Sequence, residues 1–421
     1  MFQIILLGSD DLQLSRKKKV AIVVAGFILS IVIALVSFGF LISEHFASEL
    51  LWQKLIPAKN GRKLAIIVVG LLGGTIVGYL HKKWGALPQT AEASLNQLRT
   101  QKMVDYQPVF KSLLLAFVIL VFGAGVGPEA GLLGAVVALS VWESDKLRYF
   151  YFTETPLEKL SWWAWLHRLL MPNRYLLSYD QKRSQATHKQ RTKHFFDVLF
   201  IINGLITFTL LMKLSGQPSF ITKMGTSHWH WQELWLIIPL VILGVLFGDA
   251  YRYFARWCQQ LFSFWSQRPI AKAWLGAGAV ILVALSMPNL LFSGQVSIAL
   301  APFVGMKQSF LFLITAAIAK LIYLQICVNT GWLGGDIFPV TFASIIAGFA
   351  VAQLLPQFDH LFVVAIVSTA SLITMLQKPV LASVFVALFF PINLWPIILV
   401  ILLLAMGYQR IYKLRQKQPI G

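Results

Sequence analysis

Two short stretches of the sequence place a carboxylate beside glycines and a proline within apolar runs. They are GVGPE at residues 125–129 and GGDIFP at residues 334–339. Backbone that leaves the helix inside a bilayer must be buried in protein or line a wet cavity, because each unsatisfied amide costs about 4 to 8 kcal/mol. Proline is favoured in the first turn of a helix, so Pro128 and Pro339 predict two helices that start inside the membrane.

A helix that starts at mid-membrane presents free N–H groups and about half a positive elementary charge, which suits an anion. Glycines before the proline let the backbone approach the ion closely. Two such starts facing each other would replace much of the ion's hydration without a fully charged residue, so the ion would leave quickly. One stretch alone would be explained by close helix packing, but a pair favours a site. The predicted anion-binding residues are Gly125, Val126, Gly127, Asp336, Ile337 and Phe338.

The composition indicates that these stretches lie in a membrane. Of 421 residues, 57% are hydrophobic and only 13% are charged, and the mean hydropathy is +0.70, as in a multi-pass membrane protein. The net charge of +19 comes from basic residues between the apolar runs, which is typical of cytoplasmic loops that face anionic lipid and not of nucleic-acid binding. We therefore expect a protein of the cell membrane with a cytoplasmic N-terminus and a basic, cytoplasmic C-terminal tail.

The residue types that perform enzymatic or metal chemistry are not grouped in this sequence. Cys258 and Cys327 both lie in apolar surroundings, so neither a disulfide nor a thiolate metal site is expected. His228 and His230 have no carboxylate or cysteine cluster beside them and belong with interfacial aromatic residues. We predict a non-enzymatic protein with no metal and no cofactor.

The apolar runs divide the chain into three parts. Runs at 108–141 and 361–406 exceed the roughly 20 residues that span a bilayer, and glycines or prolines interrupt them, so we expect broken and re-entrant helices. A basic, polar stretch at 143–194 predicts a cytoplasmic loop with a surface-lying amphipathic segment, between membrane halves at 1–142 and 195–421. Because each half contains one of the two breaks, the predicted fold is an all-α integral membrane protein with an inverted repeat.

At these residues the sequence resembles the CLC family of chloride channels and chloride/proton antiporters. The likeness is carried by AGVGP at 124–128, GDIFP at 335–339, WGALP at 84–88 and SGQVSIALAP at 293–302. This resemblance implies a CLC-like fold and transport of chloride or a similar small inorganic anion along helix N-termini. It also implies a homodimer in the bilayer, with one pathway in each subunit.

The sequence departs from that family at several of the side chains that define its pathway. By the resemblance, the serine that donates to the anion would fall at Gly85, and the gating glutamate would fall at Val126. Tyr408 and Tyr412 are the nearest counterparts of the family's pore tyrosine. Backbone amides are then the remaining donors to the anion, and gating or proton exchange would need another residue.

Three charged residues near the breaks have two interpretations each. Glu129 would act as a gate or proton carrier, or it would only complement the dipole of its own helix. Asp336 would cap the second helix, which is the favoured role, or it would be a second tethered anion. Lys320 would raise the positive potential felt by the anion, or it would extend to the membrane surface.

The predicted function is transport of chloride or a similar small anion, as a channel or passive transporter. One alternative is a proton-coupled anion antiporter that uses Glu129. The others are a transporter of fluoride or another anionic solute, and a degenerate membrane protein that binds a partner and transports nothing.

Overall fold

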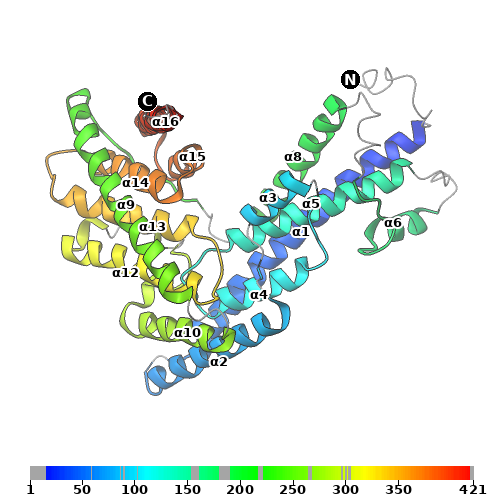
Figure 1. Ribbon diagram of the computed structural model, residues 1–421, viewed down its shortest axis with the longest axis horizontal. Coiled ribbons are helices and arrows are strands. Elements are labelled where there is room, and N and C mark those ends of the chain that lie inside the picture. The colour runs from blue at the N-terminus through cyan, green and yellow to red at the C-terminus, as the bar shows by residue number, and fades with distance from the viewer. Residues whose placement is uncertain are drawn as a thin grey trace. The chain divides into compact units, whose positions relative to one another are not determined.

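The computed structural model is built from helices in the part of the chain that it describes. This part comprises residues 16–57, 59–85, 87–88, 91–101, 103–152, 161–179, 190–216, 221–263, 268–294, 297–298, 301 and 305–417. The α-helices are α1 (Arg16–Glu49), α2 (Arg62–Trp84), α3 (Ala91–Gln101), α4 (Val109–Val121), α5 (Glu129–Phe152), α6 (Trp162–Leu170), α8 (Gln190–Leu214), α9 (Ile237–Ser263), α10 (Pro269–Ser286), α12 (Phe310–Asn329), α13 (Ile337–Gln353), α14 (His360–Leu376), α15 (Pro379–Phe389) and α16 (Trp395–Lys417) (Figure 1).

Six helical stretches among the described residues are long and apolar enough to cross a membrane. They are Lys17–Leu55, Arg62–Trp84, Phe195–Leu214, Trp231–Ser263, Pro269–Ser286 and Phe310–Asn329. The remaining apolar helices are shorter than a full span. The prediction of broken helices is confirmed, because the run at 108–141 divides into α4 and α5, and the run at 361–406 divides into α14, α15 and α16.

The chain forms two compact units that do not follow chain order. Unit 1 comprises Met1–Ser43, Gln89–Leu113 and Gly131–Gln217, and unit 2 comprises Glu44–Pro88, Leu114–Ala130 and Pro218–Gly421. The division predicted from the sequence, into 1–142, 143–194 and 195–421, differs from these units. The expected loop at 143–194 needs correction at its start, since α5 continues through Phe152, whereas α6 is an amphipathic segment of the kind expected within that stretch. Apolar residues such as Leu147 and Phe150 maintain the helix beyond residue 143.

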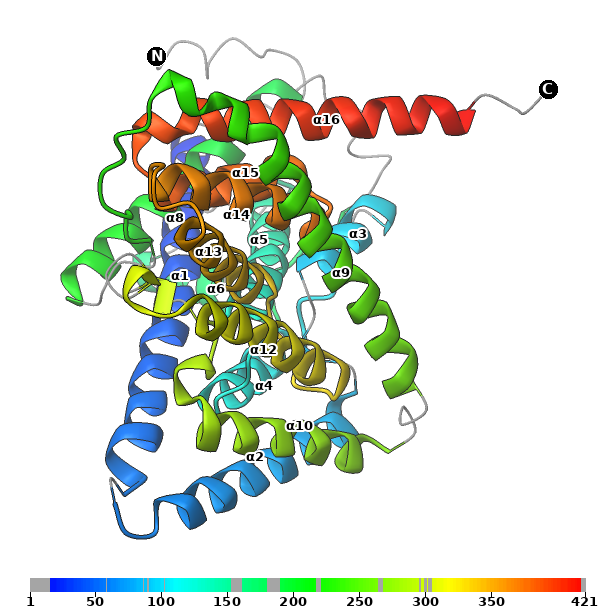
Figure 2. The same cartoon turned by 90° about the vertical axis from the view of Figure 1, so that its left-hand side faces the viewer.

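The centre of unit 2 is a group of helices buried on all sides. Almost every residue of α13 and α14 is buried, which is typical of core helices in a membrane protein. The two helices pack on each other, α13 also packs on α12, and α14 packs on α9 (Figure 2). The packing is close because α9 has Gly244 and Gly248 facing α14: a Cβ at Gly244 would lie 2.8 Å from the Val367 carbonyl oxygen.

Unit 1 has its own apolar cluster around the second half of α5. Trp142 and Phe150 of α5 pack with Ala25 and Leu29 of α1 and with Trp165 and Leu169 of α6. This cluster attaches α6 to α5 along one side of the short helix.

Candidate anion site

The first break, between α4 and α5, is held by donors from other parts of unit 2. The Gly123 carbonyl accepts hydrogen bonds from the Tyr323 hydroxyl at 2.6 Å and from the Phe292 N–H at 3.3 Å. The Gly125 N–H donates to the Cys327 Sγ atom at 3.4 Å. Tyr323 and Cys327 both lie on α12, so this helix replaces the hydrogen bonds that the broken helix cannot make for itself.

The two glycine-rich breaks meet at a pair of glycines. Gly127 and Gly335 form an antiparallel bridge in which each N–H donates to the carbonyl of the other residue at 2.7 Å. A Cβ at either position would lie within 2.0 Å of an atom of the Glu129 carboxyl group, so glycine at both positions leaves room for this carboxyl group. The bridge therefore joins the two stretches that the sequence placed in separate halves and brings the starts of α5 and α13 together.

The Glu129 side chain completes the N-terminus of α13. Glu129 is the first residue of α5, and its Oε1 atom accepts a hydrogen bond from the Phe338 N–H of α13 at 3.2 Å. The N–H groups of Ile337 and of Glu129 itself are also oriented to donate to this carboxyl group. The carboxylate thus occupies the place beside free helix amides where an anion would bind.

The Glu129 carboxyl group is only partly satisfied in this position. Its Oε2 atom is buried and has no hydrogen-bond partner among the described residues, although the residue as a whole is partly exposed. A buried charged oxygen without a donor is costly, so the carboxylate is not held firmly.

Asp336 does not have the capping role that we favoured from the sequence. It occupies the N-cap position of α13, but its side chain makes no capping hydrogen bond. The physical reason lies in its backbone, whose φ of −105° and ψ of −14° are helical, whereas a capping side chain requires an extended backbone. Glu129, which is distant in sequence, takes over the capping function.

Two of the six predicted anion ligands, Ile337 and Phe338, have backbone amides that face the Glu129 carboxylate. The amides of Gly125 and Gly127 are engaged with Cys327 and Gly335 in this structure, and their role as ligands stays a prediction. Val126 is fully buried, and its Cγ2 atom would lie 2.2 Å from a Cβ placed at Gly334, so its side chain fills space between the two breaks.

Lys320 is a structural cation in unit 2. It is completely buried on α12, so the interpretation that it extends to the membrane surface is wrong. Its ammonium group donates to the carbonyl of Leu290 at 2.9 Å and to the carbonyl of Phe292. Since the Phe292 N–H bonds to Gly123, Lys320 stabilises the segment that supports the first break.

The three remaining candidates lie at the ends of helices. Gly85 is exposed at the end of α2 with a φ of +77°, which glycine adopts readily. One turn earlier, His81 contacts the Gly331 carbonyl at 2.5 Å, which places the end of α2 near the segment that leads to the second break. Tyr408 and Tyr412 belong to α16, and their side chains lie outside the described part of the structure.

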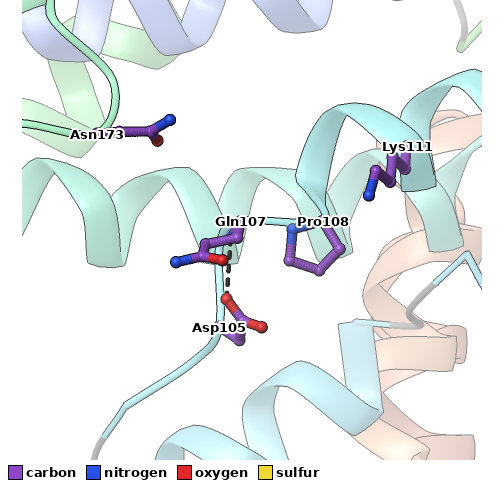
Figure 3. A pocket seen from close by; sticks show the side chains of 5 residues that line it. All are labelled: Asp105, Gln107, Pro108, Lys111 and Asn173. Carbon is purple, nitrogen blue, oxygen red and sulfur yellow. Dashed lines mark hydrogen bonds between the residues drawn. The ribbon is translucent and has the colours of Figure 1, made fainter.

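A surface pocket in unit 1 was also considered as an anion site. It is lined by Asp105, Gln107, Pro108, Lys111 and Asn173 (Figure 3). The Asp105 carboxylate accepts the backbone N–H of Gln107 at 3.0 Å, and the lining contains both this acid and the basic residue Lys111. This mixed charge does not favour an anion, and the start of α13 is the better candidate.

Sequence reasoning found both breaks but missed the residues that connect them. It listed Gly127 as a ligand and left out Gly335, and for Cys327 it argued only against a disulfide and a thiolate metal site. The glycines at each break were the available signal, because a residue without a Cβ leaves room for a close neighbour, which here is the Glu129 carboxyl group.

Comparisons with known proteins place this fold among anion transporters. Residues 196–410, just over half of the chain, match the family model of the voltage gated chloride channel. A search of curated protein sequences gave no match.

Three solved structures resemble the fold over nearly all of the chain. The crystal structure of a slow cyanobacterial Cl−/H+ antiporter has a TM-score of 0.67 and 16% identity, with 92% of this chain and 95% of that chain covered. A CLC-type fluoride/proton antiporter has a TM-score of 0.61 and 16% identity, with 93% and 96% covered. A eukaryotic CLC transporter has a TM-score of 0.60 and 14% identity, with 93% and 72% covered. With its broken apolar helices, the family match and these three likenesses, the chain belongs to the voltage gated chloride channel family.

Proposed function

We propose that this protein transports chloride or a similar small anion past the N-terminus of α13, with Glu129 as the gate. The observation that carries the proposal is the Glu129 carboxylate, which accepts the Phe338 N–H at 3.2 Å and so takes the place of a bound anion. A free anion can enter only when the carboxylate leaves, because both require the same helix amides. The partly unsatisfied carboxyl group favours such an exchange.

Backbone groups around Glu129 would form the anion site without a positively charged side chain. The N–H groups of Ile337 and Phe338 and the dipole of α13 would stabilise the anion, and no lysine or arginine would hold it in place. Such a site releases its ion readily, as a transport pathway requires.

A second candidate is proton-coupled antiport, which the same side chain favours. Glu129 is ionisable, stands in the proposed pathway and leaves one buried oxygen, Oε2, without a partner. If the carboxyl group took up a proton on one side of the membrane and released it on the other, proton and anion movements would be linked. The solved antiporters of similar fold support this candidate.

The experiment is chloride efflux from proteoliposomes that contain the full chain, with simultaneous recording of external pH. We expect efflux to rise as the pH falls, because a protonated Glu129 is neutral and no longer competes with the anion. Glu129→Gln should remove this pH dependence. A matched control is Asp249→Asn, since Asp249 is a partly exposed acid that pairs with Arg252 on α9.

The outcomes separate the candidates. Proton movement in fixed ratio to chloride, lost in Glu129→Gln, would assign antiport in place of passive transport. Efflux of fluoride without efflux of chloride would assign another anion. Absence of flux for every anion tested would support a degenerate, non-transporting protein and reject the proposal.

The proposal includes three further features, of which the first rests on family membership and the other two on the apolar runs and the placement of the basic residues. These are a homodimer with one pathway per subunit, a location in the cell membrane, and a cytoplasmic position for the basic termini and for the polar stretch around 143–194. Cross-linking in the reconstituted membrane and protease access from either side would test them.

A further inference from the structure

The short helix α6 in unit 1 has more apolar surface than its packing buries. Trp165 and Leu169 are buried in the cluster with α1 and α5. In contrast, Trp162 is 57% exposed, Trp163 is 76% exposed and Leu170 is 43% exposed. At about 100° per residue, Trp163 and Leu170 project on nearly the same side of the helix, away from the buried pair. The helix therefore has a second apolar face that the described part of the protein does not cover.

This second face is held in a fixed orientation. Lys146 of α5 is completely buried, and its ammonium group donates to the carbonyls of Arg168 at 3.0 Å, of Arg174 at 2.6 Å and of Met171. The Trp142 indole N–H of α5 donates to the Pro172 carbonyl at 2.9 Å. Because these bonds end α6 and hold the segment after it, the exposed tryptophans belong to a built surface and not to a frayed end.

Basic residues border the exposed tryptophans. His167 and Arg174 are exposed, and the Arg168 guanidinium lies 5.3 Å from the centre of the Tyr175 ring. The described stretch 161–179 contains no acidic residue. Tryptophan next to cationic side chains is typical of segments that lie at the headgroup level of a bilayer, where anionic lipids attract the charges.

We propose that α6 and the segment to Arg174 form an interfacial anchor that binds anionic phospholipids. Trp163 and Leu170 enter the boundary between headgroups and acyl chains, and His167 and Arg174 contact lipid phosphates. The anchor attaches unit 1 to the membrane surface independently of the anion site in unit 2.

The test uses the full chain in vesicles, with a fluorescent label on one introduced cysteine. The native Cys258 and Cys327 are buried, so a label reacts selectively at Trp163→Cys or, as the matched control one residue away, at Ala164→Cys. Lipids brominated near the headgroup end of the acyl chain should quench the label at position 163 at least about twofold more than the label at 164. Equal quenching at the two positions would overturn the anchor.

A second comparison tests the preference for anionic lipid. Quenching at position 163 should be stronger in vesicles that contain phosphatidylglycerol than in phosphatidylcholine alone, and Arg174→Gln should remove this difference. Arg174→Gln keeps the backbone carbonyl that Lys146 uses, so the fold is not disturbed. Quenching that does not depend on phosphatidylglycerol in the unaltered protein would overturn the preference for anionic lipid, and unchanged chloride efflux in both labelled variants would verify that they are folded.

Discussion

Two helix ends in this protein are each completed by a charged side chain of α5. At the start of α13 the Glu129 carboxylate accepts an N–H group, and at the end of α6 the Lys146 ammonium donates to carbonyl groups. In both places the side chain carries the sign opposite to the charge of the helix end. The same electrostatic arrangement is therefore used once with a negative and once with a positive charge.

The two charged side chains differ in how many of their polar atoms have hydrogen-bond partners. Lys146 is fully buried and has three carbonyl acceptors, whereas Glu129 is partly exposed and its Oε2 atom has no hydrogen-bond partner among the described residues. A fully satisfied ion fixes the structure, because removal exposes several unpaired groups. A partly satisfied ion can exchange with a free ion of the same sign, which is what a gate requires.

The largest expected effect is the loss of stability when Lys146, whose ammonium group has three carbonyl acceptors, is replaced. Lys146→Met should lower the free energy of unfolding by about 3 kcal/mol, because three carbonyls lose their donor. Thermal unfolding of the full chain in detergent measures this change. Lys111→Met, which removes an exposed lysine of the same unit, serves as the control. Equal melting of the two variants would show that Lys146 does not hold the end of α6.

Lys320 provides a second fixed cation, with two carbonyl acceptors in place of three. Lys320→Met should cost about 2 kcal/mol of stability. Chloride efflux per folded protein should stay within about twofold, because the ammonium group is committed to backbone carbonyls and does not hold the anion. A large loss of efflux without a loss of stability would instead favour the electrostatic role considered from the sequence.

Gly335→Ala tests whether the transported anion binds where the Glu129 carboxylate lies. The added Cβ would lie 2.0 Å from the position of the Glu129 carboxyl carbon, so a methyl group would displace both the carboxylate and a free anion. Chloride efflux should fall about tenfold, equivalent to about 1.4 kcal/mol, while the backbone bridge to Gly127 persists. Gly278→Ala is the matched control, since a Cβ there meets nothing within 4 Å. Unchanged efflux in Gly335→Ala would place the anion pathway elsewhere.

The smallest effect on stability is expected at Asp336. Asp336→Asn should change stability by less than about 0.5 kcal/mol, because the Asp336 side chain does not cap α13. Chloride efflux and thermal unfolding can both be measured on this variant. A loss near 1 kcal/mol, typical of a removed N-cap, would return the capping role from Glu129 to Asp336.

Much of the fold could be predicted because its causes are local. The apolar runs, the glycine-rich interruptions and the helix start after Pro128 all depend on neighbouring residues, and the structure has α5 starting at Glu129. The second start differs slightly, since α13 begins at Ile337, two residues before Pro339. The continuation of α5 beyond residue 143 was missed, because the charges of that stretch obscured the apolar side that packs in unit 1.

The amino-acid pattern is enough to identify a multi-pass membrane protein with two interrupted helices whose starts suit an anion. Hydrophobic length and the backbone properties of glycine and proline act over a few residues, so they can be recognised in the chain. The pairing of Gly127 with Gly335, and the hydrogen bond by which Glu129 caps α13 at a residue 209 positions away, became visible in the folded structure. These contacts depend on how distant segments pack, and the preferences of neighbouring residues do not specify which amide, carbonyl or carboxylate will be brought together.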